Sequence, residues 1–574
     1  MKAVASRVVP ETVLALLVGL LVLAEPFRVP LLDPDEGRYA EVPREMLASG
    51  DWVVPRQNGL VFLDKPPLSY WLVAGSFRLL GESEGAARLP GKLATVATML
   101  ALFLFARRRA GERTGALAAL FLGGSLLSFG LARTVLTDPI LAAAQTGAVL
   151  AFASLCEGGG SDLRREKALA VAFALSAAAA VLAKGLVGVV LPGGAVLLWS
   201  AATGTWRPLR RLLAPGPVAL FLAVAVPWHV AAALREPEFL RYYFGHEHLD
   251  RFLRPDHHRT GAPWFYLAVL GAGFLPWTAL LPRLRLAWPG FRRTELRSRP
   301  AETFLWIWLL LVFAFFSASS SKLVTYVLPA FPALALLLAF ATARGEDADA
   351  LSRGERRALL GLFGALSVAA AVFGATDLVA FPGLSGPALG LAAALLLGFL
   401  LVGAVPLVAP GQGLRAAAAA WVLFLAAAHV ALPPFVRGYG SWPLVEALEK
   451  ERRPGDVVVQ RGDYVHSLVF YSRQRTPLSR IRPKDELDLG RRLDRSGVFQ
   501  SDESFAALWN GPRRVLALLH RDVLREWTGP GSLRTTYAVL AADRDGRHLL
   551  VSNDPGRTLA RNGPSSAPEG SAIR

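Results

Sequence analysis

Long runs of apolar residues separated by short charged breaks make up most of the chain. Runs such as 304–316, 358–373 and 416–432 are rich in Leu, Ala, Val and Phe and carry almost no charge. With their flanks they approach the roughly 20 residues that a helix needs to cross the ~30 Å hydrocarbon core of a bilayer. The pattern predicts a polytopic α-helical membrane protein with about 13 transmembrane helices, at residues 12–28, 88–106, 115–133, 139–156, 168–183, 185–202, 213–233, 262–281, 301–317, 323–342, 358–380, 386–408 and 414–433.

Composition and charge support a membrane protein. The 574 residues are 53% hydrophobic and only 19% charged, and the mean hydropathy is +0.39, which excludes an ordinary soluble protein of this length. The net charge of +17 comes largely from arginines in the breaks, as at 107–109, 207–211 and 353–357. That distribution is typical of cytoplasmic loops that contact membrane lipids, and it argues against nucleic acid as a partner. Cys156 is the only cysteine, so no intramolecular disulfide and no cysteine-based metal cluster is expected.

The first apolar run has two interpretations. Lys2 and Arg7 before the run at 12–24 are compatible with a signal peptide or with a first transmembrane helix, and we favour a retained helix. With the arginine-rich breaks inside, the segment at 33–41 lies outside the cytoplasm under either interpretation. An odd number of spans places the end of the chain outside as well.

Two further regions differ from the apolar runs. The first outer loop, about 33–81, alternates apolar and polar patches after residue 45, with Trp and Tyr among them; it predicts interfacial helices, or else an irregular loop. Beyond the transmembrane region at 1–435, apolar runs shorten to strand length at 456–460, 467–471 and 514–519, between helix-compatible segments at 444–453 and 502–509. This indicates a small periplasmic α/β domain at 436–560, followed by a disordered tail at 561–574 that is rich in Gly, Ser and Pro.

The segment 33–41 carries four carboxylates and one arginine in nine residues. Dense charge beside a bilayer is costly and usually marks a site. On the predicted topology the outer loops also hold acids, bases and imidazoles, whereas the inner loops hold mostly arginine. Such a face suits the transfer of a sugar from a lipid phosphate, because a carboxylate can orient or deprotonate the acceptor and cations can absorb charge on the departing phosphate.

Several motifs along the chain resemble a known class. The first outer loop reads DEGRYAE at 35–41, GDWVVP at 50–55 and DKPP at 64–67. Further motifs are TDP at 137–139, AKG at 183–185, RYYF at 241–244 with EH at 247–248, and SKLVTYVLP at 321–329. In this order, over about residues 10–435, they resemble bacterial aminoarabinose (lipid A) transferases. Those enzymes stand with the protein O-mannosyltransferases among the polyprenyl-phosphate-sugar-dependent membrane glycosyltransferases, and the resemblance implies their GT-C fold.

The resemblance implies roles for particular residues. The catalytic carboxylates would be Asp35, Glu36 and Asp138. The lipid phosphate and donor would be held by Arg38, Lys65, Lys184, Arg241, Lys322 and Tyr326. A divalent metal ion could be shared by Asp64 and His248. The sequence departs from the aminoarabinose-transferase pattern at Gly37, where a hydroxyl residue is common, and at Asp64, which replaces a longer Glu.

Structural explanations compete with these roles. Asp35 could cap the following helix or pair with Arg38. Asp138 before a proline is a common helix start, and Lys184 and Lys322 could snorkel at helix ends.

The expected function is transfer of a sugar from a polyprenyl-phosphate donor, undecaprenyl phosphate being favoured, to a lipid, glycan or protein acceptor. The reaction would proceed by an inverting single displacement at the outer face of the bacterial inner membrane. An enzyme resembling the protein O-mannosyltransferases is the alternative within the class. A transporter or flippase for lipid-linked substrates and a non-catalytic scaffold are the alternatives outside it, but these ionisable groups gather at one face and no inverted repeat is evident.

Overall fold

The computed structural model describes most of the chain. The described residues are 10–25, 29–158, 162–250, 261–262, 264–345, 349–380, 385–438, 441–481, 485–494, 496–528, 537–543 and 546–554, and side chains are not described at a few further positions within helices. The chain divides into two compact units. The helical unit comprises Met1–Val29, Val42–Pro55 and Leu63–Phe435, and the C-terminal unit comprises Pro30–Glu41, Arg56–Phe62 and Val436–Arg574.

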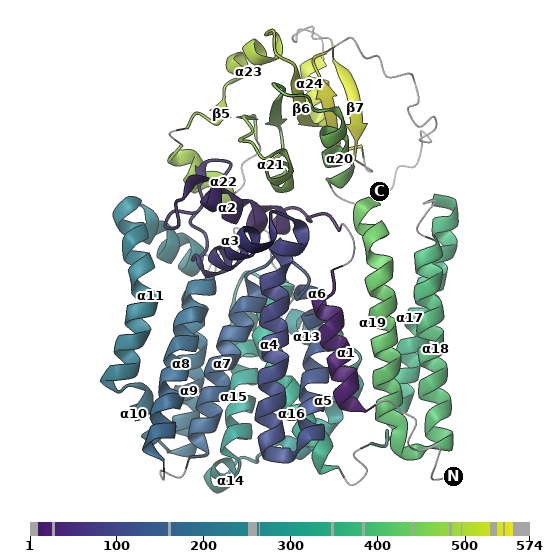
Figure 1. Ribbon diagram of the computed structural model, residues 1–574. Coiled ribbons are helices and arrows are strands. Elements are labelled where there is room, and N and C mark those ends of the chain that lie inside the picture. The colour runs from purple at the N-terminus through teal and green to yellow at the C-terminus, as the bar shows by residue number, and fades with distance from the viewer. Residues whose placement is uncertain are drawn as a thin grey trace. The chain divides into compact units, whose positions relative to one another are not determined.

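The helical unit is a bundle of upright helices (Figure 1). Its first half contains α1 (Glu11–Leu23), α3 (Leu68–Leu80), α4 (Glu84–Ala110), α5 (Glu112–Gly123), α6 (Leu126–Leu131), α7 (Asp138–Cys156), α8 (Leu163–Lys184), α9 (Val187–Thr203), α10 (Arg207–Leu212) and α11 (Pro215–Arg235). Its second half contains the π-helix η1 (Arg241–Asp250), α13 (Phe265–Gly273), η2 (Trp277–Ala287), α14 (Arg293–Ser298), α15 (Pro300–Ala318), η3 (Val324–Ala330), α16 (Phe331–Arg344), α17 (Arg353–Ala380), α18 (Ser385–Val408), η4 (Pro410–Gln412) and α19 (Gly413–Gly438). Helix α2 (Asp35–Ser49) begins in the C-terminal unit and ends in the helical unit.

The chain is a multi-span membrane protein, as its apolar pattern predicts. Within the described residues, nine helices are long and apolar enough to cross a bilayer, or ten if α13 and η2, bent by 105° at their break, form one span. Helices α1 and α9 are shorter apolar helices. Each of the thirteen predicted ranges contains helix. The α13–η2 break contains Pro276, which cannot donate a helical hydrogen bond.

Large aromatic residues hold the bundle together inside. The indole N–H groups of three buried tryptophans donate to backbone carbonyls on other segments: Trp199 to Pro300 at 3.0 Å, Trp308 to Pro329 at 2.7 Å and Trp421 to Gly124 at 2.6 Å. The indole N–H of a buried tryptophan usually finds such a partner. Leucines on α18, in contrast, remain exposed, as expected of a helix that faces lipid.

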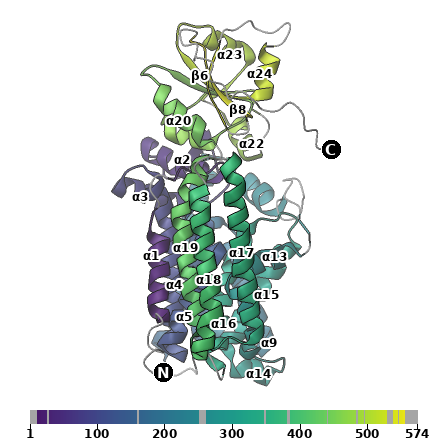
Figure 2. The ribbon, with the colours of Figure 1, turned by 90° about the vertical axis from the view of Figure 1, so that its right-hand side faces the viewer.

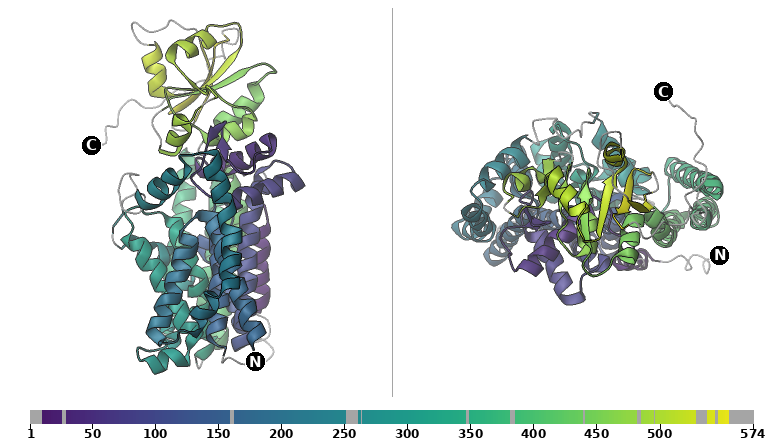
Figure 3. Two further views of the ribbon diagram at one scale, coloured as in Figure 1. Left: turned by 90° about the vertical axis from the view of Figure 1, so that its left-hand side faces the viewer. Right: turned by 90° about the horizontal axis from the view of Figure 1, so that it is seen from above.

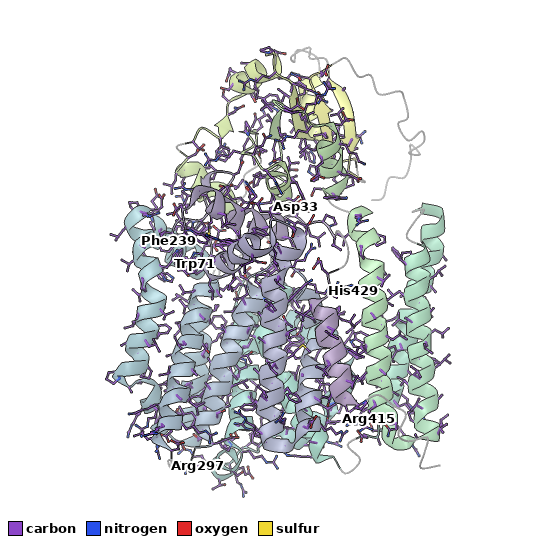
Figure 4. All side chains as sticks on the ribbon, in the orientation of Figure 1. Asp33, Trp71, Phe239, Arg297, Arg415 and His429 are labelled. Atoms are coloured by element: carbon purple, nitrogen blue, oxygen red, sulfur yellow. The ribbon has the colours of Figure 1, made fainter. Side chains whose placement is uncertain are left out.

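Arginines from the charged breaks pair with buried acids at one end of the bundle. Arg207 and Arg211 reach Glu166 at 3.0 and 2.9 Å, and Arg415 reaches Glu11 at 3.1 Å. In Figure 4, Arg297 and Arg415 lie toward this end of the helical unit, whereas Trp71, Phe239 and His429 lie toward the other. The breaks therefore supply structural ion pairs in addition to any role in topology.

The C-terminal unit is a three-layer α/β/α domain (Figures 2 and 3). Its strands are β3 (Val457–Arg461), β4 (Leu478–Ser479), β5 (Phe499–Gln500), β6 (Val515–His520), β7 (Ala538–Ala542) and β8 (His548–Ser552), in the order β5-β4-β3-β6-β8-β7. The first four strands in this order are parallel, and β8 is antiparallel to β6 and β7. Its helices are α20 (Trp442–Glu451), α21 (His466–Ser472), α22 (Asp485–Arg492), α23 (Asp502–Trp509) and α24 (Arg521–Thr528).

Strand β6 shows how the sheet is buried on both faces. Leu516 and Leu518 pack with residues of α20 and α21, whereas Val515 and Leu519 pack with residues of α23 and α24. This two-sided burial explains the continuous apolar run that predicts a strand at 514–519. The run at 467–471 also predicts a strand, and this is wrong: it lies in α21, because a short buried apolar run has no periodicity that separates strand from helix.

Two segments of the first outer loop belong to the C-terminal unit. Beside residues 30–41, the loop contributes a hairpin of β1 (Arg56–Gln57) and β2 (Leu60–Val61). Asn58 in its turn donates to the carbonyl of Thr476 at 2.8 Å and accepts from the Thr476 amide at 2.7 Å, as a paired strand would. The predicted boundary at residue 436 does not include these segments, because they are joined to the domain only through contacts distant in sequence.

A histidine between two aspartates makes the stability of the C-terminal unit depend on pH. His548 Nε2 lies 3.1 Å from Asp463 and Nδ1 lies 2.7 Å from Asp543, and the His520 ring lies 5.4 Å away. The hydrogen bonds to the two carboxylates raise the pKa of His548 against the opposing effect of burial. A raised folded-state pKa stabilises the fold fully below the unfolded-state value of about 6.5, and this contribution is lost as pH rises through the folded-state pKa. Protection of β8 amides from hydrogen exchange in the full-length protein, corrected for intrinsic rates, is therefore expected to be greater at pH 6 than at pH 9.

The variant His548→Gln provides the control for this pH dependence. It keeps a hydrogen-bonding side chain but does not titrate, so the difference in β8 protection between the two pH values should shrink. An unchanged difference in the variant would assign the pH dependence to another group.

Candidate active site

Most of the predicted donor-site residues of the helical unit meet at one cavity. It has a volume of about 420 Å³. The polar residues that line it are Asp64, Lys65, Asp138, Lys184, Glu247, Ser319 and Tyr326. The apolar residues are Leu141, Leu186, Val187, Val190, Phe244, Phe315 and Phe316. They come from the segment before α3, from α7, the α8–α9 junction, η1, α15 and η3.

An ion pair between two helix ends stands in this cavity. Asp138 is the first residue of α7 and Lys184 is the last of α8, and Lys184 Nζ lies 2.5 Å from Asp138 Oδ1. Each charge sits where its helix dipole favours it. Gly185, at φ +92°, ends α8 and lets the chain turn directly into α9. Asp138 thus starts one helix and Lys184 ends another, and both side chains line the cavity.

Lys184 retains capacity to bind an anion. Its side chain is 14% exposed, and its ammonium lies 5.0 Å from the centre of the Tyr326 ring. An ammonium has three donors, of which the bond to Asp138 uses one. The Tyr326 ring supports the cation through its negative face. A phosphate oxygen can therefore be added without breaking the ion pair.

A second lysine pairs with a glutamate far away in sequence. Lys65 Nζ donates to Glu247 Oε2 at 2.6 Å and to the Asp64 carbonyl at 2.9 Å. The Asp64 carboxylate accepts from the Tyr242 hydroxyl at 2.8 Å. Both Lys65 and Glu247 are largely buried, with 13% and 4% of their side chains exposed. The cavity thus contains two lysine–carboxylate pairs beside apolar walls.

Lys322 and Arg241, two predicted residues of the helical unit, do not line the cavity. Lys322, between α15 and η3, donates to the carbonyls of Phe316 at 3.1 Å and Ser317 at 2.5 Å, so it caps the end of α15. Arg241 is exposed at the start of η1 and does not line the cavity. The side chain of His248 lies outside the described residues, so the predicted metal pair with Asp64 stays a prediction. Within the described part of the chain, no three acidic, histidine or cysteine side chains converge as a metal site would require.

The acidic segment at the start of α2 belongs to the C-terminal unit. The Asp35 side chain is 56% exposed, and its oxygen lies 3.8 Å from the buried Arg38 guanidinium. Glu36 is buried and accepts the Leu32 amide at 2.9 Å, so it closes the turn that starts the helix. Of the two neighbouring carboxylates, Asp35 is the one presented to solvent.

Asp33 attaches this segment to the C-terminal domain. Its carboxylate accepts from the backbone N–H of Ser467 at 2.8 Å and from the hydroxyls of Ser467 and Ser441. Gly37 lies against the same place: a Cβ there would stand 2.8 Å from the Ser467 Cα. Glycine at position 37, where the aminoarabinose-transferase pattern commonly has a hydroxyl residue, therefore has a physical explanation. A side chain there would push α2 away from α21.

Replacing Asp33 by alanine should loosen this attachment. Three donors lose their acceptor, which is expected to cost about 1–3 kcal/mol in the stability of the C-terminal unit. Hydrogen exchange in the full-length protein should then accelerate at residues 30–41 and at the Ser467 amide. Lys450→Ala, which removes only an exposed pair with Glu446, should leave both unchanged. Unaltered exchange in Asp33→Ala would show that other contacts hold the segment.

The cavity residues that are not among the predicted site residues include Glu247 and Phe244. Glu247 forms an ion pair with Lys65, although the two residues are 182 positions apart in the sequence. Phe244 contributes to the apolar wall. Both lie within the motifs at 241–248 that carry the resemblance, and this is the signal by which they could have been found.

Comparison with known proteins agrees with the sequence motifs. Residues 64–230 match the family model described as dolichyl-phosphate-mannose-protein mannosyltransferase, and residues 444–553 match the aminoarabinose transferase C-terminal domain. The undecaprenyl phosphate-alpha-4-amino-4-deoxy-L-arabinose arabinosyl transferase of Edwardsiella ictaluri is 36% identical over 345 residues, which is 59% of this chain and 61% of that relative. The transferase of the same name from Aeromonas salmonicida is 34% identical over 368 residues, 61% of this chain and 64% of the relative. The matched regions thus span less than two thirds of these relatives.

A solved structure extends the likeness to nearly the whole chain. The crystal structure of ArnT from Cupriavidus metallidurans bound to undecaprenyl phosphate aligns with a TM-score of 0.81 at 27% identity, covering 95% of this chain and 98% of that one. In fold, and in sequence within each of its two units, the chain therefore resembles the aminoarabinose transferases and shares their membrane-glycosyltransferase architecture.

Proposed function

We propose that the protein transfers a sugar from an undecaprenyl-phosphate donor to lipid A at the outer face of the bacterial inner membrane. 4-Amino-4-deoxy-L-arabinose or a close analogue is the favoured sugar, because the named relatives are transferases for it. The observation that carries the proposal is the cavity in which Lys65 and Lys184 stand beside apolar walls. A polyprenyl phosphate has this same division between a charged head and an apolar chain.

The cations would act on the leaving group. As the bond to the sugar breaks, negative charge grows on the lipid phosphate, and donors already aimed at it stabilise the transition state without reorganising. Asp138 and Glu247 hold the two ammonium groups in place until the donor arrives. Tyr326 supports the Lys184 cation from its ring face.

The acceptor would be activated by a carboxylate. Asp35 is exposed and can accept a proton from, or orient, the attacking hydroxyl or phosphate oxygen of the acceptor. Attack opposite to the leaving phosphate is a single displacement and inverts the anomeric centre. A donor of known anomeric configuration should therefore give the opposite configuration in the product, and retention would contradict this mechanism.

A divalent metal ion remains a further proposal. Asp64 lies in the cavity with one oxygen bonded to Tyr242, and it would contribute one ligand. The resemblance implies His248 as the second ligand. Bound there, such an ion would add positive charge beside the lipid phosphate. We assign no step of the reaction to it.

The proposed function is tested by supplying donors to the purified full-length protein in nanodiscs. A panel of undecaprenyl-phosphate sugars is incubated with lipid A, with a hydroxyl-rich peptide or with no acceptor, and the released undecaprenyl phosphate is measured. Release that requires lipid A supports the proposal. Release that requires the peptide supports the protein O-mannosyltransferase-like alternative, which the family match at 64–230 makes a specific competitor. Movement of the donor between leaflets without release would identify a transporter.

A further inference from the structure

A second group of basic side chains lies at the same end of the helical bundle as the cavity. Arg88 and Lys92 project from the first turns of α4 toward Glu25, which follows α1. Arg88 donates to Glu25 at 3.1 Å and to the Val29 carbonyl at 2.8 Å. Lys92 donates to the other Glu25 oxygen and to the Ala24 carbonyl at 3.0 Å. Both carboxylate oxygens of Glu25 are thus already engaged.

Arg133 adds a further cation to this group. It lies between α6 and α7, within electrostatic reach of Glu25 and Arg88, with its guanidinium 5.1 Å from the centre of the Phe129 ring. Its Nε and Nη2 atoms are buried and have no hydrogen-bond acceptor among the described residues. His429 of α19 lies within reach of Arg133, Lys92 and Glu25, and its Nδ1 is likewise buried without a partner in the described part of the chain. Figure 4 places His429 toward the end of α19 opposite Arg415.

Arg133 is the cation of this group that stands apart. Glu25 pairs with Arg88 and Lys92, whereas Arg133 forms no ion pair within the described part of the chain. A buried guanidinium without an acceptor is destabilising, and folded proteins rarely tolerate it unless a ligand or water completes it. A purely structural ion pair would need only Arg88, Lys92 and Glu25.

A phosphate group would supply the hydrogen-bond acceptors that Arg133 lacks among the described residues. Arginine presents a planar set of donors that matches two oxygens of a phosphate, and these charge-assisted bonds are stronger than neutral ones. His429 can add a further donor or acceptor. A phosphomonoester also brings negative charge to the Arg133 guanidinium, whose Nε and Nη2 have no acceptor among the described residues.

The cluster is distinct from the cavity but adjoins it. None of its members lines the cavity. Arg133 shortly precedes Asp138 in the chain, and a Cβ at Gly91 of α4 would lie 3.4 Å from the Thr134 carbonyl and 3.8 Å from Pro139. Residues 132–139 therefore pack against α4 beside Gly91, which lies between Arg88 and Lys92 in the sequence.

We infer that Arg133, Arg88, Lys92 and His429 form a second phosphate-binding site, which takes a phosphomonoester. This rests on the proposed function in one respect: in a sugar transferase acting on lipid A, the second phosphate is that of the acceptor. The same chemistry would also bind inorganic phosphate, and the test separates the two sources.

Binding is measured without donor, so the result does not depend on turnover. Native mass spectrometry of the full-length protein is carried out with bisphosphorylated lipid A, with enzymatically dephosphorylated lipid A and with inorganic phosphate as competitor. Arg133→Gln is expected to weaken binding of the phosphorylated lipid about 10- to 100-fold. Dephosphorylated lipid should bind wild type and variant alike. Arg164→Gln, at an exposed arginine of α8, should change nothing.

A conservative variant distinguishes loss of the binding site from misfolding of the protein. Arg133→Lys keeps the charge and should lose less than tenfold in affinity, which a merely unfolded protein could not show. Competition by inorganic phosphate at equal affinity would assign the site to the free anion rather than to a lipid. Undiminished binding of the phosphorylated lipid by Arg133→Gln would overturn the inference, whether or not the protein transfers sugar. Conversely, intact binding in a protein without transferase activity would reject the proposed function and leave the phosphate site standing.

Discussion

Asp35→Asn is expected to lower turnover about 10²- to 10⁴-fold, the range over which general acid–base groups usually contribute. Asparagine keeps the size and polarity of the side chain but cannot accept a proton at neutral pH. Because the Asp35 side chain is 56% exposed and lies 3.8 Å from Arg38, its replacement should change stability by no more than about 0.5 kcal/mol. The measurement is the rate of undecaprenyl phosphate release in nanodiscs, with thermal unfolding of the same samples.

The chain offers a matched control for this variant. Asp522 in the C-terminal unit is 59% exposed, so Asp522→Asn makes the same chemical change at a similar exposure. It should retain wild-type turnover. Substantial activity in Asp35→Asn would refute the assignment and would direct attention to Asp138.

Lys184→Met is expected to lower turnover about 10²- to 10³-fold, as the loss of one preorganised donor to a developing anion does in other enzymes. Methionine preserves the length of the side chain and its contact with Tyr326 but removes the charge. The change also leaves Asp138, only 7% exposed, without its partner, which is expected to cost about 3–5 kcal/mol of stability. Turnover is again followed by undecaprenyl phosphate release.

A double variant separates the two consequences. Lys184→Met with Asp138→Asn has no uncompensated buried carboxylate, so stability should recover while turnover stays low. Recovery of both would mean that the ion pair matters only for folding, and the proposed contact between Lys184 and the lipid phosphate would be wrong.

Local patterns were sufficient to predict the helical unit. Every predicted apolar range contains helix. In lipid the backbone N–H and C=O groups must bond to one another, and a helix satisfies them within one segment. Residues at predicted outer helix ends, such as Lys184 at the end of α8 and Asp138 at the start of α7, come together because their helices run side by side. The mixed charges of the outer loops predict a reactive face, and these two residues of that face line the same cavity.

Contacts distant in sequence could not be predicted in this way. The bond between Lys65 and Glu247 spans 182 positions, and that between Asp33 and Ser467 spans 434. The hydrophobic periodicity of the sequence does not indicate which distant residues form such pairs. The residues 467–471 show the same limit at short range, since their apolar character fixes burial but leaves the choice between strand and helix to the surrounding fold.

The attachment of residues 30–41 through Asp33 has a consequence for how the protein is made. This segment leaves the ribosome early, while Ser441 and Ser467, which hold it, emerge only after almost all of the membrane helices. A nascent chain can therefore insert and fold much of its bundle before the segment that carries Asp35 acquires its final anchor. A chain cut short before Ser441 and Ser467 lacks the groups that hold Asp33.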